Sequence, residues 1–163
     1  ALPIFAFAFY KNSYIGRTFI KPTQEERESS VHLKLSVLES VVKDKRIVLV
    51  DDSIVRGTTI ANLIHMLKEA GAKEVHVRIS SPPFLHPCYF GTDVPSNDQL
   101  IAASHSTEEI CKMIGADSLG YMQTDYLEGM AGGLPLCKAC FDGNYPMEIP
   151  DYTNAEFADI VKC

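Results

Sequence analysis

The sequence has no tryptophan, few basic residues and no long apolar run. Its 163 residues contain 15 Lys and Arg against 21 Asp and Glu, which gives a formal net charge of −6. An acidic balance argues against broad contact with a phosphate backbone, so we expect no nucleic-acid partner. The apolar start, ALPIFAFAFY, extends for only ten residues and lacks a basic beginning. We therefore expect neither a membrane span nor a secretory signal.

The residues that are present have the composition of one ordinary folded domain. Apolar residues make up 46% of the chain and charged residues 22%, which excludes collagen, coiled coil and disorder. A chain of this length can bury a core without disulfide staples. The cysteine count is odd, at five. With no signal peptide, this count indicates reduced thiols and a cytoplasmic location rather than a disulfide framework.

A strand–loop–helix–strand pattern occupies the middle of the chain. Four apolar residues at Ile47–Val50, between charged neighbours, predict a buried strand. Thr58 or Thr59 can cap the helix that follows, and Gly71 stands where a left-handed helix stop belongs. Alternation over Val75–Ile79 predicts a second strand, parallel to the first. The sequence therefore predicts an α/β fold with a parallel sheet and flanking helices.

Weaker patterns flank this unit. Ser106 and Glu109 have the spacing of a capping box at the start of a helix that ends near Gly115. Residues 129–163 are an irregular Gly/Pro/Cys tail with no long apolar period, so we expect two parts, 1–128 and 129–163. The other expected elements are a strand at 2–10 covered on both faces, a partial helix at 31–42, and strands at 100–102 and 118–122.

Two adjacent carboxylates, Asp51 and Asp52, follow the first central strand. Open α/β sheets bind ligands at the carboxyl ends of their strands. The loop that follows supplies backbone N–H groups, the hydroxyls of Ser53, Thr58 and Thr59, and a helix N-terminus, all suited to a phosphate. The pattern favours a ligand with vicinal hydroxyls and a phosphate monoester, such as a ribose 5-phosphate. The alternative is a solvated strand end with two ordinary loop acids.

The segment from Ile47 to Thr59, IVLVDDSIVRGTT, closely resembles the phosphoribosyl pyrophosphate (PRPP) motif of type I phosphoribosyltransferases. The flanking blocks YIGRTFI, KEAGAKEVHV, SSPP and HPC narrow the resemblance to the glutamine PRPP amidotransferase family, over residues 1 to about 149. It implies a partial type I phosphoribosyltransferase fold, a parallel Rossmann-like sheet with flanking helices. It also implies an enzyme that converts PRPP and glutamine-derived ammonia, with Mg²⁺, to 5-phosphoribosylamine and pyrophosphate at the first step of purine biosynthesis.

The same resemblance assigns roles to individual residues. Asp51 and Asp52 would accept hydrogen bonds from the ribose hydroxyls and lie near Mg²⁺ through PRPP. Arg17 and Lys21, in a loop that resembles the family's flexible lid, would meet the charge of the pyrophosphate, and Lys34 is a weaker candidate. The residues expected around the 5-phosphate are Ser53, Ile54, Val55, Arg56, Gly57, Thr58 and Thr59.

Cys137 and Cys140 form a CxxC pair, which by itself is compatible with a metal site or a redox pair. The resemblance extends to an iron–sulfur branch of the family, in which a [4Fe–4S] cluster is bound by four cysteines. Cys88, Cys137 and Cys140 match three of them, and the fourth has no counterpart in this chain. We expect Cys111 to be a small core residue and Cys163 a tail thiol; the alternative is that one of them replaces the missing ligand. The cluster is expected to be incomplete or absent here.

The resemblance further implies a glutaminase domain in the same parent chain, regulation by purine nucleotides and a homo-oligomer. Nothing here resembles that glutaminase domain, and the resemblance implies that the pyrophosphate-binding loop and first core strand of the transferase domain lie before Ala1. We therefore expect this piece to be inactive alone. Two other classes remain open: another type I phosphoribosyltransferase, or a non-catalytic domain that senses PRPP or nucleotides. A zinc or redox module would rest on the CxxC pair alone and would leave the segment 51–59 unexplained.

Overall fold

The computed structural model describes residues 4–11, 35–91 and 96–149, and the fold is built on a three-stranded parallel sheet. Its strands are β3 (Arg46–Asp51), β4 (Glu74–Ile79) and β5 (Ser118–Tyr121), hydrogen-bonded in that order. Both pairings are parallel, with Asp51 opposite Ile79 and Ile79 opposite Tyr121. The three strands therefore end side by side, and the predicted α/β architecture is confirmed.

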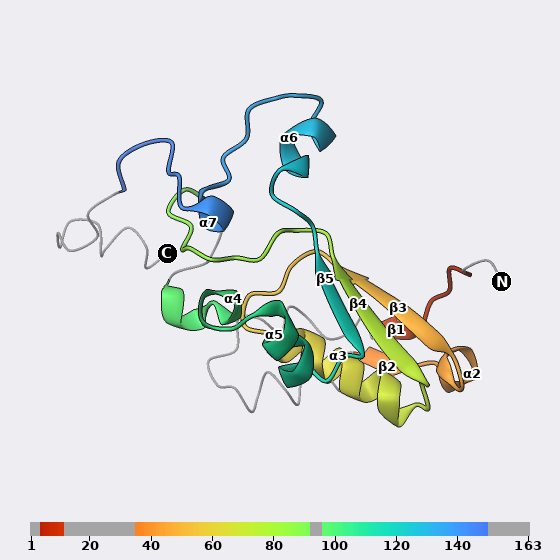
Figure 1. Cartoon of the computed structure of the whole chain (residues 1–163). Coiled ribbons are helices and arrows are strands. Elements are labelled where there is room, and N and C mark those ends of the chain that lie inside the picture. The colour runs from red at the N-terminus through yellow and green to blue at the C-terminus, as the bar shows by residue number, and fades with distance from the viewer. Residues whose placement is uncertain (1–3, 12–34, 92–95, 150–163) are drawn as a thin grey trace.

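One face of this sheet is covered by helices. The helices α3 (Thr58–Glu69) and α5 (Thr107–Met113) lie on the same side of the strands (Figure 1). Their apolar residues join those of the sheet in one core, because every second strand residue points toward them. Fully or almost fully buried members of this core are Ile60, Ile64 and Leu67 of α3, Val75, Val77 and Ile79 of β4, and Ile110 of α5.

The predicted helix boundaries are largely confirmed. Ser106 caps α5, and its side chain and that of Glu109 make the reciprocal bonds of a capping box. Gly71 ends α3 with a φ of 87°, and its N–H donates to the Lys68 carbonyl at 3.0 Å. The expected threonine cap of α3 is wrong. Gly57, with a φ of 82°, holds that position and offers no side-chain cap.

Several peripheral elements differ from the sequence-based expectation. Residues 4–8 form no regular structure, and Phe5 and Phe7 are 86% and 75% exposed, so the strand expected at 2–10 is neither long nor buried. The expected strand at 100–102 is helical, because the turn η1 (Asn97–Gln99) leads directly into α4 (Ile101–Ser104). The peripheral strands and the short helix near the N-terminus are β1 (Phe9–Lys11), β2 (Leu35–Val37) and α2 (Glu39–Val42).

No described element covers the face of the sheet opposite the helices. Val48 and Val50 of β3 are 63% and 68% exposed, so the prediction of a fully buried central strand is correct for only one face. β3 lies at the edge of the sheet and is paired, among the described residues, with β4 alone. The apolar run in β3 therefore has a partner layer on one side only.

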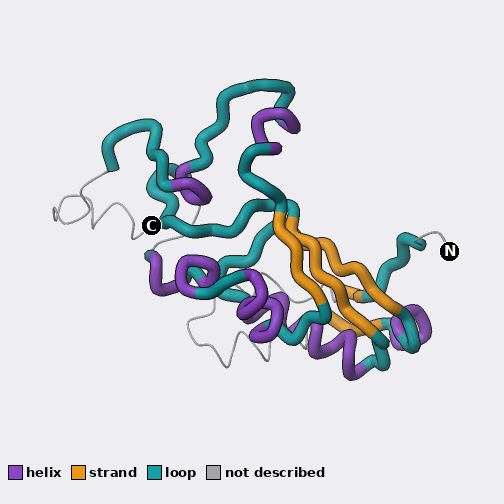
Figure 2. Tube along the Cα trace, viewed as in Figure 1, coloured by secondary structure: helices purple, strands orange, loops and turns teal. Residues whose placement is uncertain are grey.

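The C-terminal part lies beyond the carboxyl ends of the strands (Figures 1 and 2). It contains α6 (Tyr126–Met130) and α7 (Ala139–Asp142), so the expected boundary at residue 128 falls inside α6. The ring of Phe141 packs on that of Phe84 with centroids 5.0 Å apart. The tail is therefore held by the segment that follows β4, as expected for a stretch without its own core.

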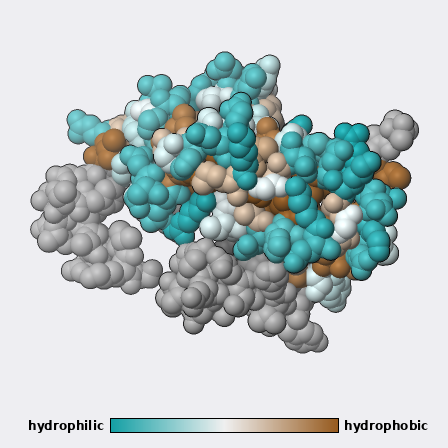
Figure 3. All heavy atoms as spheres, turned by 60° about the horizontal axis from the view of Figure 1, so that its bottom comes forward, coloured by the Kyte–Doolittle hydropathy of each residue, from teal (hydrophilic) through white to brown (hydrophobic). Residues whose placement is uncertain are grey.

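The outer surface of the helical side is mostly hydrophilic. Figure 3 turns this side toward the viewer, and hydrophobic atoms are confined there to hollows and edges. Across the described ranges, none of the helices is long and apolar enough to cross a bilayer.

Candidate functional site

The carboxylates of Asp51 and Asp52 stand at the carboxyl end of β3, where the sequence predicts them. The N–H of Asp52 donates to Asp51 Oδ1 at 3.0 Å, and Ser53 Oγ donates to Asp52 Oδ1 at 3.2 Å. The carbonyls of the two aspartates accept the N–H groups of Ser80 and Ser81, each at 3.0 Å. The segment after β4 therefore fixes the backbone that carries both carboxylates.

The two carboxylates differ in environment. Asp51 is partly buried, and burial is the main reason that its pKa is raised above the usual value. The neighbouring charge of Asp52 raises it further, while the Asp52 N–H opposes the shift. Asp52 is exposed. A raised pKa means that ionised Asp51 opposes folding, and this loss of stability grows as the pH rises past its unfolded value. A ligand that donates hydrogen bonds to Asp51 would offset that loss.

The loop between β3 and α3 is fixed by the main core and by hydrogen bonds to η1 and α4. Ile54 is 2% exposed and lies in the main core, so only its backbone can contact a ligand. The Val55 carbonyl accepts the Ile101 N–H at 2.9 Å, and the Arg56 guanidinium donates to the Gln99 side chain. The loop is therefore braced against η1 and α4.

The N-terminus of α3 is open to a ligand. Its cap is Gly57, which places no side chain over the first amides, and Thr58 and Thr59 are exposed beside them. A Cβ at Gly57 would lie 3.1 Å from Ile101 Cδ1. Glycine at this position therefore permits both the left-handed φ and the close packing of α4 against the loop.

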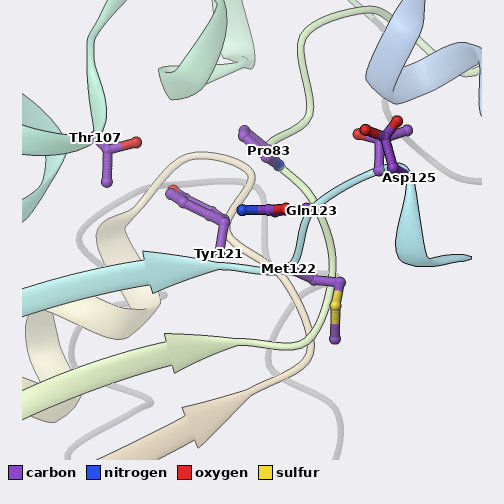
Figure 4. A pocket seen from close by; sticks show the side chains of 7 residues that line it. Pro83, Thr107, Tyr121, Met122, Gln123 and Asp125 are labelled. Carbon is purple, nitrogen blue, oxygen red and sulfur yellow. The ribbon is translucent and has the colours of Figure 1, made fainter.

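The structure adds a hollow that the sequence interpretation missed, at the end of β5. It measures about 470 Å³ and is open to solvent. Figure 4 shows Tyr121 pointing toward Thr107, with Gln123 and Asp125 on the loop that leaves the strand. Among the described residues the Tyr121 hydroxyl has no hydrogen-bond partner, although it is buried, and burial raises its pKa to about 12. The sequence could have indicated this hollow, because its residues follow the third parallel strand and ligands bind at the carboxyl ends of such strands. The hollow is lined by Pro83, Thr107, Tyr121, Met122, Gln123, Thr124 and Asp125.

Cys88 and Cys137 lie close enough to Cys140, on the tail helix α7, to act on it electrostatically. Burial raises the pKa of the Cys140 thiol to about 11, and the nearby Cys88 and Cys137 add to the shift. Within the described part of the chain, no three His, Cys, Asp or Glu side chains converge on a single metal ion. An iron–sulfur cluster makes a different demand, because its thiolates bind separate iron atoms.

Cys111 lies apart from the other three thiols. It is partly buried on α5, and its Sγ donates to the Ala116 carbonyl at 3.3 Å, close to the start of β5. Cys88 and Cys140 instead pack against Phe84 and Leu100, in the cluster beyond the end of β4. Arg17, Lys21, Lys34 and Cys163 lie outside the described residues.

The chain is similar in sequence to known phosphoribosyl-transferring proteins. A model of the phosphoribosyl transferase domain matches residues 7–80. The amidophosphoribosyltransferase of Archaeoglobus fulgidus is 52% identical over 156 residues, which cover 91% of this chain and 33% of the relative. That of Pyrococcus horikoshii is 59% identical over 136 residues, covering 83% of this chain and 30% of the relative.

A solved structure agrees in both sequence and fold. It is the glutamine PRPP amidotransferase from Bacillus subtilis complexed with ADP and GMP, with a TM-score of 0.75 and 50% identity. The match covers 90% of this chain and 34% of that chain. The present chain thus spans about a third of the length of the relatives it matches. It belongs to the amidophosphoribosyltransferase family and corresponds to part of its phosphoribosyl transferase domain.

Proposed function

We propose that this chain carries the ribose 5-phosphate site of an enzyme that makes 5-phosphoribosylamine and pyrophosphate from PRPP and glutamine-derived ammonia, at the first step of purine biosynthesis. The observation that supports it best is the direct succession of two carboxylates, a braced loop and the open N-terminus of a twelve-residue helix. The carboxylates of Asp51 and Asp52 accept the ribose hydroxyls. The amides of residues 53–59, with the Ser53, Thr58 and Thr59 hydroxyls, hold the 5-phosphate.

A divalent cation fits the same end of the sheet. Carboxylate oxygens are the donors that Mg²⁺ prefers, and Asp51 and Asp52 present them side by side. Bound with PRPP, Mg²⁺ would offset negative charge on the leaving pyrophosphate. Arg17 and Lys21 are proposed to add positive charge there from the lid. With the sugar held and water excluded, no side chain has to act as a nucleophile.

The donor chemistry of the three thiols fits an iron–sulfur cluster, and we propose Cys88, Cys137 and Cys140 as ligands. Four thiolates complete such a site, so the fourth would come from outside the described residues. We also propose that the parent protein acts in the cytoplasm as an oligomer, that purine nucleotides regulate it, and that a glutaminase domain supplies its ammonia. These proposals follow from the family resemblance. Alone, this piece should make no 5-phosphoribosylamine.

Binding of PRPP with MgCl₂ to the chain, followed by NMR or calorimetry, tests the ribose site. Asp52→Asn should weaken binding about 10–100-fold, because a hydrogen bond to a charged group is worth about 1.5–3 kcal/mol. Asp98→Asn, an exposed acid on η1, is the matched control and should bind like the unmodified chain. Equal affinity of the Asp52 variant and the control would contradict the assignment.

Anaerobic reconstitution of the full-length parent protein, which would supply the fourth ligand, with iron and sulfide tests the thiol site. Bound iron and its visible absorbance should fall sharply in Cys137→Ser and stay unchanged in Cys111→Ser, because Cys111 lies at the other end of the sheet. Iron content that is the same in both variants would contradict the proposed ligand set.

A further inference from the structure

The loop between β3 and α3 is contacted by three consecutive residues, 99–101, where η1 runs into α4. The Arg56 guanidinium donates to the side-chain carbonyl of Gln99. The Val55 side chain packs against the cluster that contains Leu100, and the Val55 carbonyl accepts the Ile101 N–H at 2.9 Å. Residues 99–101 therefore fix the loop just before it turns into the N-terminus of α3.

Two of these three residues also belong to the hydrophobic cores. Leu100 is a buried member of the second cluster, and Ile101 packs against the main core. A substitution at either position would disturb the fold as well as the loop. Gln99 is different, because it is only partly buried and belongs to neither cluster. Among the described residues its side chain bonds to Arg56 alone. Gln99 is therefore the position at which the loop can be released while both cores stay intact.

The direction of the Arg56 side chain bears on how the loop holds a phosphate. A guanidinium is a strong phosphate ligand, so an arginine in this loop would be expected to contact the 5-phosphate directly. In the structure the Arg56 guanidinium is instead bonded to a neutral amide on η1. In the described part of the chain, no carboxylate forms an ion pair with Arg56. The Gln99 bond is therefore the contact that holds this side chain away from solvent.

We propose that Gln99 is a positioning residue for the 5-phosphate of PRPP and acts through Arg56. The hydrogen bond between them holds the loop backbone in the arrangement in which its amides surround the phosphate, and the guanidinium does not itself bind the phosphate. A loop that is held in its bound geometry before the ligand arrives loses less entropy on binding. The inference rests on the proposed PRPP site, and it adds a residue outside the 51–59 segment that sets the geometry of that site.

A double-mutant cycle in the full-length parent protein tests this role, with binding of PRPP and MgCl₂ measured by calorimetry. Gln99→Ala should weaken PRPP binding about 3–10-fold, because the loop loses a hydrogen bond to a charged group. Arg56→Ala should have a similar effect. The double variant should bind no more weakly than either single variant, because both substitutions remove the same bond. Gln99→Glu keeps an acceptor oxygen and should bind within about threefold of the unmodified protein.

Asn97→Ala is the matched control, since Asn97 is an exposed amide in the same turn. It should bind PRPP like the unmodified protein. Hydrogen exchange without ligand provides a second measurement. The amides of Ala61 and Ile101 donate to carbonyls of the loop, so they should exchange faster in Gln99→Ala. Their exchange should not change in Gln99→Glu or in the control.

Equal PRPP affinity of Gln99→Ala and the unmodified protein would overturn the inference and leave the proposed site in place. A loss in Arg56→Ala that far exceeds the loss in Gln99→Ala would also overturn it, because the guanidinium would then contact the phosphate directly. If the unmodified protein bound no PRPP, the proposed ribose site would itself be wrong, and the role of Gln99 would fall with it.

Discussion

Gly57 shows at the residue scale how the loop and the core constrain one another. Its φ of 82° favours glycine, and a Cβ there would approach Ile101 Cδ1 to 3.1 Å. Gly115 has a similar φ of 74°, but a Cβ there would meet nothing within 4 Å. An alanine at Gly115 would therefore meet backbone strain alone, whereas an alanine at Gly57 would meet backbone strain and side-chain crowding.

We expect Gly57→Ala to lower the free energy of unfolding by about 1–3 kcal/mol, because it adds crowding to a strained φ. Gly115→Ala should lower it by only about 1 kcal/mol. Urea denaturation followed by circular dichroism measures both. If both variants lost the same free energy of unfolding, the Ile101 side chain would be able to move aside freely, and packing against α4 would not constrain the loop.

The adjacent aspartates show that a sequence pattern can predict where two residues lie without predicting how their ionisation differs. Their position at the end of a strand was predictable from four apolar residues followed by two acids. Their difference was not, because it arises mainly from burial of Asp51, which the fold places opposite Ile79 of β4. The Tyr121 hydroxyl escaped prediction for the same reason, since only the folded chain shows that it is buried and that no described residue bonds to it.

At the element scale, local signals predicted helix ends well when the bonding groups were close in sequence. The box of Ser106 and Glu109 involves two residues three positions apart, and the structure confirms it. The threonine cap of α3 was wrong, because the sharp turn out of β3 requires a left-handed residue, and Gly57 supplies it. Residues 100–102 were mistaken for a strand because a short apolar run has no decisive period.

Removal of the α5 cap should have a measurable cost. Ser106→Ala should lower the free energy of unfolding by about 1 kcal/mol, because the N–H of Glu109 loses its acceptor. Ser104→Ala, at an exposed position two residues earlier, should change it by less than about 0.5 kcal/mol. Thermal and urea unfolding provide the comparison. A loss at Ser104 as large as that at Ser106 would show that the cap itself contributes nothing.

At the scale of the whole molecule, the tail and the candidate site share a second hydrophobic cluster. Phe84 and Leu100 are its buried members, and Val55, Cys140 and Phe141 pack against it. The N–H groups of Leu85 and His86 both donate to the Cys140 carbonyl, at 2.9 and 3.1 Å. The tail is therefore attached to the segment after β4 and to the loop after β3.

Loss of the Phe141 ring should release the tail and leave the sheet intact. In Phe141→Ala we expect faster hydrogen exchange at the amides of Leu85 and His86 and earlier proteolysis within residues 129–149. Exchange in the β3–β4–β5 sheet should not change. Leu134→Ala, at a position 65% exposed, is the control and should behave like the unmodified chain. Uniformly faster exchange through the sheet would mean that the tail is part of the main folding unit.

The sequence by itself determined the parallel strand–helix–strand unit, the capping box and the position of the two carboxylates. Each depends on neighbours in the chain or on the period of apolar residues, which are local properties. The tertiary structure alone decided which face of β3 is covered, that Cys88 and Cys140 pack against one cluster, and that the ends of β3 and β5 align. Those features depend on contacts between segments tens of residues apart, and no local pattern encodes them. The small number of basic residues is a property of the whole chain and says nothing about where an anion binds. Only folding determines that position.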